Sequence, residues 1–169
     1  LTISEDVSKN DYYNFQVNPN PKNNAYAMVE YKKGQYSVLL NDNYYDIRTL
    51  LTKGVKVMQG DQSPNYPVMA WDGKGTRLLV MYAEDAKIKM FVWDHVAKYK
   101  RFKQIIEGVD QIVDASFMLD ANTVILSAVK NGHTDIFIYK IEENKLEQVT
   151  NDVYDDLNPT YVSFPNRSG

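Results

Sequence analysis

The sequence predicts an all-β protein made of many short antiparallel strands. Strand-forming residues are abundant, with 17 Val, 10 Ile and 13 Tyr among the 169 residues. Asn, Asp, Gly and Pro together supply 44 residues, and they interrupt the apolar runs at short intervals, as turns do. No segment keeps a sustained apolar period of 3.6 residues, so we expect no helical repeat.

Composition excludes several classes of protein. Apolar residues make up 44% and charged residues 24% of the chain, which is typical of a folded domain with its own core. The net charge of −3 gives no basic footprint for nucleic acid, so we expect no nucleic-acid partner. No apolar run approaches the ~18 residues of a membrane helix, so we expect no membrane span. The absence of Cys excludes a disulfide scaffold and a cysteine nucleophile.

The first segment, residues 1–24, contains few apolar positions. Within it, Val17–Asn24 reads V-N-P-N-P-K-N-N, which turn chemistry assigns to a loop. We therefore treat residues 1–24 as a leader that supplies at most a first strand.

Three β-hairpins are expected after this leader. Their strand pairs are 25–31 with 35–41, 77–83 with 87–94, and 123–129 with 134–141. The last pair is joined through Asn131-Gly132, the strongest short hairpin signal in the chain. A further strand follows each hairpin, at 45–51, 99–105 and 146–150. Apolar residues of segment 94–106 also fit helical spacing, but the neighbouring units favour a strand there.

These units repeat. Trp71, Phe117 and Tyr161 occupy equivalent positions and are spaced by 46 and 44 residues. A period in the mid-forties with about four short strands per unit is typical of a β-propeller blade. The sequence thus predicts a partial β-propeller of about three four-stranded antiparallel blades, at 25–62, 63–109 and 110–156, with the start of another at 157–169. Propellers close with at least four blades, so we expect a fragment of a larger propeller that self-associates through its open blade edges.

The C-terminal repeat resembles a known family. Asn131–Tyr139, Leu146–Asp152 and Tyr154–Tyr161 resemble the TolB-like (WD40-like) β-propeller repeat, as found in the propeller regions of large Bacteroidetes envelope proteins. The resemblance implies a periplasmic or cell-envelope location and a non-catalytic scaffold that binds a protein partner or an envelope ligand. The alternative it leaves open is the propeller that gates a serine-peptidase-type hydrolase, or part of a carbohydrate-active protein.

Candidate site residues lie in predicted turns. His133 and Asp135 could form a catalytic or metal pair, although we favour Asp135 as an acceptor for backbone N–H groups. His95 is expected on the surface. Asp152, Asp155 and Asp156 could bind calcium, which prefers oxygen ligands, but capping of a turn is the favoured role, so no cofactor is expected.

Two further groups were weighed between function and packing. The basic run 98–103, interleaved with aromatic residues, could contact nucleic acid, but an edge strand guarded by lysines explains it better. Six tyrosines are placed in turns, where they suit ligand contact and blade packing equally: Tyr12, Tyr13, Tyr44, Tyr45, Tyr66 and Tyr154. Tyr66, His133, Asp135 and Tyr154 are the loop-displayed residues we expect in a binding surface.

Overall fold

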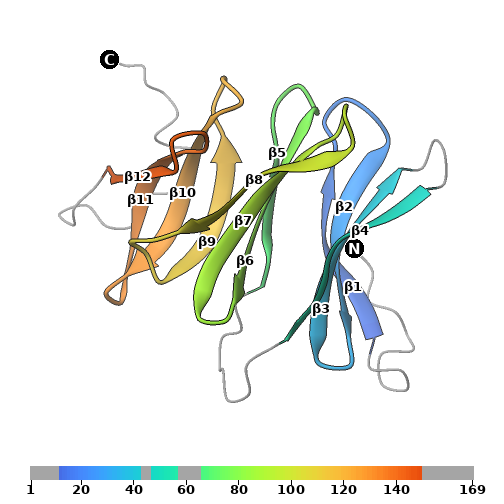
Figure 1. Cartoon of the computed structure of the whole chain (residues 1–169), viewed down its shortest axis with the longest axis horizontal. Coiled ribbons are helices and arrows are strands. Elements are labelled where there is room, and N and C mark those ends of the chain that lie inside the picture. Colours follow the sequence, from blue (N-terminus) through green and yellow to red (C-terminus); the bar gives the residue numbers. More distant parts are fainter. Residues whose placement is uncertain (1–11, 43–46, 57–65, 150–169) are drawn as a thin grey trace. The chain divides into compact units, whose positions relative to one another are not determined.

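The computed structural model describes residues 12–42, 47–56 and 66–149. These residues form twelve β-strands and no helix, arranged as three four-stranded antiparallel sheets (Figure 1). The all-β prediction is confirmed. The chain divides into two compact units, Leu1–Pro67 and Val68–Gly169. The first unit holds sheet 1, and the second holds sheets 2 and 3.

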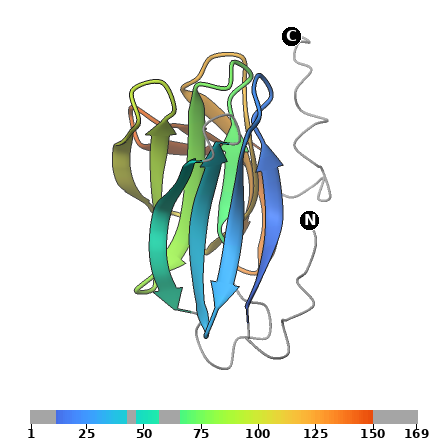
Figure 2. The ribbon, with the colours of Figure 1, turned by 90° about the vertical axis from the view of Figure 1, so that its right-hand side faces the viewer.

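Sheet 1 is a simple meander, and Figure 2 turns its four strands toward the viewer. Its strands in spatial order are β1 (Tyr12–Pro19), β2 (Ala25–Lys32), β3 (Gln35–Asp42) and β4 (Ile47–Lys56). The loop prediction from Val17 onward is wrong at its start, because β1 continues through Pro19 and its last two residues pair with β2 after a register shift. Tyr12 and Tyr13 belong to the same strand, so their assignment to a turn is also wrong.

Sheet 2 repeats the meander. It consists of β5 (Val68–Trp71), β6 (Arg77–Glu84), β7 (Lys87–Asp94) and β8 (Tyr99–Ile106), paired in that order. The strand interpretation of segment 94–106 is confirmed, since β8 pairs with β7 over its length. β8 is an edge strand of this sheet.

Sheet 3 has the same plan. It consists of β9 (Gln111–Phe117), β10 (Thr123–Lys130), β11 (His133–Lys140) and β12 (Lys145–Gln148). β9 and β12 form its two edges, and the longer central strands β10 and β11 pair without a register shift.

One apolar core joins sheets 2 and 3. Its members from β6 and β7 include Leu79, Met81, Met90 and Val92, and its members from β10 and β11 include Val124, Leu126, Phe137 and Tyr139. The central strands of sheets 2 and 3 carry runs of consecutive buried residues, which indicates burial on both faces. The outer strands β8 and β12 are the least buried strands of their sheets.

The hairpin turns share one backbone conformation. Each central connection places two residues at positive φ: Lys33-Gly34, Asp85-Ala86 and Asn131-Gly132. This is the pattern of a two-residue turn that matches the right-handed twist of the strands it joins. Sheet 2 departs from the usual chemistry, because Ala86 (φ 61°) stands where sheets 1 and 3 carry Gly.

Candidate functional site

A groove with a volume of about 830 Å³ lies along the free edge of β8. One face of sheet 2 contributes Tyr82, Lys89, Phe91, Lys100, Lys103 and Ile105. The opposite face of sheet 2 contributes Met90, Gln104 and Ile106. Sheet 3 contributes Tyr139, Asn144 and Leu146, and Glu107 completes the lining. The groove therefore combines three lysines with aromatic, aliphatic and amide side chains.

A β-bulge in β8 shapes the basic side of the groove. Gln104 pairs with Met90 and Arg101 with Val92, so Phe102 and Lys103 together oppose the single residue Phe91. Phe102 adopts a left-handed backbone with φ of 53°, which is costly for a residue with a side chain. Side chains of a regular strand alternate between faces, so residues three apart point in opposite directions. The extra residue shifts this alternation, and Lys100 and Lys103 line the same groove.

The three lysines differ in their surroundings. Lys89 Nζ lies 2.9 Å from Glu84 Oε1 and 3.5 Å from Asp85 Oδ2, and its pKa is raised, chiefly by the hydrogen bond to Glu84. Lys100 Nζ lies 4.7 Å from the centroid of the Phe91 ring. Burial lowers the pKa of Lys100, and the charge of Lys103 lowers it further. Within the described part of the chain, neither Lys100 nor Lys103 forms an ion pair with a carboxylate.

The amide side of the groove is fixed by hydrogen bonds between sheets 2 and 3. Gln104 Nε2 donates to the Tyr139 hydroxyl at 3.0 Å and to the Ile141 carbonyl at 2.9 Å. The Tyr139 hydroxyl donates to Asn144 Oδ1 at 2.6 Å, and Asn144 Nδ2 donates to the Ile105 carbonyl on β8 at 3.3 Å. Burial raises the pKa of Tyr139 to about 12, so the phenol stays protonated at neutral pH.

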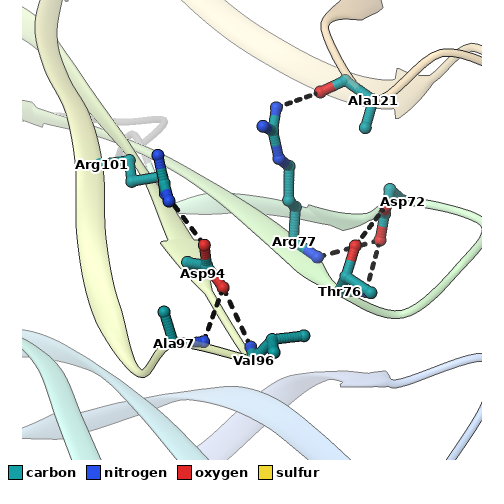
Figure 3. Close-up of polar contacts among 8 residues, drawn as sticks. All are labelled: Asp72, Thr76, Arg77, Asp94, Val96, Ala97, Arg101 and Ala121. Carbon is teal, nitrogen blue, oxygen red and sulfur yellow. Dashed lines mark hydrogen bonds and ion pairs between the residues drawn. The ribbon is translucent and has the colours of Figure 1, made fainter.

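Carboxylates brace the turns beside this region (Figure 3). Asp72 accepts hydrogen bonds from the backbone N–H groups of Thr76 and Arg77 and from the Thr76 hydroxyl. Asp94 accepts from the N–H groups of Val96 and Ala97 with Oδ1, and from Arg101 Nε with Oδ2 at 2.9 Å. These partners explain the two aspartates as structural caps rather than ligands for a metal.

A second link between the two sheets lies at these turns. Arg77 Nη1 donates to the Ala121 carbonyl of sheet 3 at 2.7 Å (Figure 3). The guanidinium carbon of Arg77 also lies 5.7 Å from the centroid of the Phe102 ring. Arg77 thus supports the bulged part of β8 from the side of the shared core.

The structure does not gather the residues that the sequence singled out. His133 is exposed at the start of β11, and Asp135 accepts a hydrogen bond from the Gln148 side-chain amide at 3.1 Å. The sequence favours Asp135 as an acceptor for backbone donors. Its carboxylate instead links the neighbouring strands β11 and β12 through the side chain of Gln148. Tyr66 belongs to the other compact unit, where its ring packs edge-on against Tyr36 at 5.1 Å.

The expectation that His95 is exposed is wrong. Only 8% of its surface is accessible, because Trp71 packs edge-on against the imidazole at 5.4 Å. Trp93 Nε1 donates to His95 Nδ1 at 3.2 Å. Since an indole nitrogen only donates, Nδ1 must be the acceptor, and the proton of the neutral imidazole is on Nε2. His95 is a packed histidine of the β7–β8 turn.

The remaining sequence candidates lie outside the described residues. These are Asp152, Asp155 and Asp156, which were considered for calcium, together with Tyr154, Tyr44 and Tyr45. The expected start of a further blade at 157–169 lies outside them as well. Among the described residues, no cluster of three or more His, Cys, Asp or Glu side chains could hold a metal ion.

Comparison with solved structures identifies the class of fold. Neither a family model nor a curated protein matches the sequence. The structure is similar to TolB from Acinetobacter baumannii, with a TM-score of 0.59 at 14% identity, over 82% of this chain and 32% of that chain. It is also similar to the β-propeller domain of the Trilobed protease from Pyrococcus furiosus, with a TM-score of 0.57 at 13% identity, over 86% and 45%.

A third match extends the range of functions on this fold. A luciferin-regenerating enzyme aligns with a TM-score of 0.54 at 7% identity, over 93% of this chain and 50% of that chain. At such low identity these matches establish the fold alone, which is that of β-propeller blades, three antiparallel four-stranded sheets. The chain spans 32% to 50% of the length of these three structures. No helix among the described residues has the length and apolar character needed to cross a membrane.

Sequence reasoning missed most of the groove. The run 98–103 did draw attention to Lys100 and Lys103, and its assignment to an edge strand is confirmed. Nothing in the sequence signals the bulge, because Phe102 is an unusual residue at positive φ. Gln104 and Asn144 are 40 residues apart in the sequence, and only the packing of sheet 3 on sheet 2 brings them into one groove.

Proposed function

We propose that this chain is a non-catalytic β-propeller segment that binds a protein partner or an envelope ligand on its surface. The groove along β8 carries the proposal, because it offers a concave surface of mixed chemistry on a rigid support. Its amide side is held in place by the bonds among Gln104, Tyr139 and Asn144, so these groups need little rearrangement before a ligand binds.

The lining of the groove suits recognition better than catalysis. Its described residues include hydrogen-bonding amides, ammonium groups and aromatic rings, the groups that fix the orientation of a bound ligand. Tyr139, with a pKa of about 12, is a poor base at neutral pH, and its hydroxyl is already engaged by Asn144. The fold leaves the activity open, since both TolB and an enzyme adopt it.

A location in the periplasm or cell envelope belongs to the same proposal. It is supported by the TolB-like repeat in the sequence and by the similarity of the fold to TolB. The second candidate function is that of the propeller of a peptidase. It is supported by the similarity of the fold to the propeller domain of the Trilobed protease. A Gly-x-Ser-x-Gly motif in the reading frame that contains this chain would favour this second candidate. The serine of that motif should then react with a fluorophosphonate in the expressed protein.

Photocrosslinking tests the binding function. A photoreactive amino acid is placed at Ile105, 38% exposed at the groove, and in a matched variant at Val113, 50% exposed on β9 and outside the groove lining. We expect a discrete, saturable adduct from position 105 only, and the captured protein, once purified, should bind the full chain in calorimetry. Equal adducts from both positions, or no binding by the purified protein, would contradict the proposal.

A further inference from the structure

Lys100 and Lys103 bring two uncompensated positive charges to one groove. Both side chains line it, and neither is paired with a carboxylate among the described residues. Like charges that share a site repel each other, and burial of Lys100 adds to the cost of charging it. An anionic group placed between the two ammonium groups would relieve both effects. The arrangement is therefore complementary to a carboxylate or another compact anion.

The bulge is the feature that creates this pair. In a regular strand, Lys100 and Lys103, which are three residues apart, would point to opposite faces of sheet 2. The backbone of Phe102 is held at φ 53° to accommodate it, and Arg77 supports the Phe102 ring from the other side. Backbone strain that persists in a folded structure is held there by surrounding contacts, and bulges commonly re-aim a side chain at a functional site.

The rest of the lining indicates what carries the anion. Tyr82 and Ile105 add aromatic and aliphatic surface beside the two lysines, while the buried ring of Phe91 lies beneath Lys100. Glu107 also lines the groove, and Glu84 and Asp85 already neutralise Lys89. A densely charged polymer such as nucleic acid would meet these carboxylates, whereas a peptide could alternate acidic residues with apolar ones. The overall net charge of −3 also opposes a polyanion.

We propose that the groove along β8 binds an acidic peptide segment of a partner protein, with Lys100 and Lys103 contacting its carboxylates and Tyr82 and Ile105 its apolar side chains. This inference rests on the proposed function, and it names the class of ligand.

Titration of the full chain with a defined peptide tests the inference. The probe is a blocked octapeptide of alternating Asp and Leu, and binding is followed by residue-resolved amide NMR. We expect the largest shifts over Lys100–Ile106 and a loss of affinity between 50 and 500 mM salt, because exposed charges are screened over that range. The corresponding Asn-Leu peptide and an eight-nucleotide oligothymidylate should bind at least tenfold more weakly.

Charge variants give the matched control. Replacing both lysines (Lys100→Gln with Lys103→Gln) should lower the affinity for the acidic peptide by roughly tenfold, because two partly exposed charge contacts are lost. Lys74→Gln with Lys130→Gln removes the same charge outside the groove lining and should change affinity by less than about twofold. Lys103→Gln alone, at an exposed position, serves if the double variant does not fold.

Several outcomes would overturn the inference. They are equal binding of the Asp and Asn peptides, equal effects of the two double variants, or tighter binding of the oligothymidylate. If the crosslink from position 105 forms but is unaffected by loss of the two lysines, the proposed binding function is retained. The inference that the ligand is an acidic peptide is then wrong. If the crosslink also fails, both proposals fall.

Discussion

At the scale of single residues, several carboxylates in the described part of the chain act as acceptors for backbone donors. Asp72, Asp94 and Asp120 each accept two backbone N–H groups and one side-chain donor at a turn between strands. Such bonds stabilise the ionised form, which is why the pKa of Asp94 lies below its ordinary value of 3.8, with the Ala97 N–H as the largest cause and Arg101 contributing as well. The stability of the turns held by Asp94 and Asp120, whose pKa values are both lowered, therefore depends on pH.

Asp94→Asn tests this dependence. A lowered folded-state pKa contributes stability above the ordinary pKa, and that contribution is lost as pH falls through the folded-state value. At pH 7 we expect the variant to lose about 1 kcal/mol of unfolding free energy, because the charged bond to Arg101 is gone. Denaturant unfolding at several pH values should show the difference between wild type and variant shrinking below about pH 4. A difference that stays constant down to pH 3 would contradict the assignment.

Tyr139→Phe tests the opposite limb of the pH profile. The hydroxyl accepts from Gln104 and donates to Asn144, so its removal at pH 7 should cost about 1–2 kcal/mol. Burial raises the pKa of this phenol to about 12, so its contribution is complete below pH 10 and declines as pH rises toward 12. The unfolding free energies of wild type and variant should converge over that interval. Parallel curves would show that Tyr139 is not the group that titrates.

At the scale of secondary-structure elements, local chemistry determines which features a sequence reveals. The hairpins were predictable within one or two residues, because apolar runs and turn residues alternate strongly there. The edge position of β8 was predictable from its lysines. The bulge at Phe102 and Lys103 was not, since it depends on how β8 pairs with β7. The burial of His95 was also missed, because the two tryptophans that surround it come from different strands.

Substitutions at the equivalent turns of sheets 2 and 3 should change the stability of the protein in opposite directions. Ala86 and Gly132 hold the same turn position, with φ of 61° and 80°. Only Gly adopts this conformation without steric cost, so Ala86→Gly should stabilise the protein and Gly132→Ala should destabilise it, each by up to about 1 kcal/mol. A Cβ at Gly132 would meet no atom within 4 Å, so the effect there is conformational. Thermal melts of both variants measure it, and changes of the same sign would refute the shared turn geometry.

At the scale of the whole molecule, sheets 2 and 3 are more than neighbouring repeats. Their facing central strands bury one continuous apolar core, and polar links from Arg77, Gln104 and Asn144 cross between them. The repeat period in the sequence predicted the sheets but not these links, which involve residues that are not equivalent in the two repeats. The candidate groove depends on both sheets, since β8 supplies its lysines and sheet 3 fixes its amides.

This shared core predicts that sheets 2 and 3 open together. Leu126 on β10 is fully buried in it, and Leu126→Ala should cost about 2–5 kcal/mol, the usual range for a cavity left by a buried leucine. In native-state hydrogen exchange, the amides of β6 and β7 should lose protection by as much as those of β10 and β11, because opening either sheet exposes the common core. Leu119→Ala is the control. This leucine is fully exposed, and its loss should change the opening free energy of either sheet by no more than about 0.5 kcal/mol. Loss of protection confined to sheet 3 would mean that each sheet is stable by itself, and the groove between them would then lose the rigidity on which its proposed function depends.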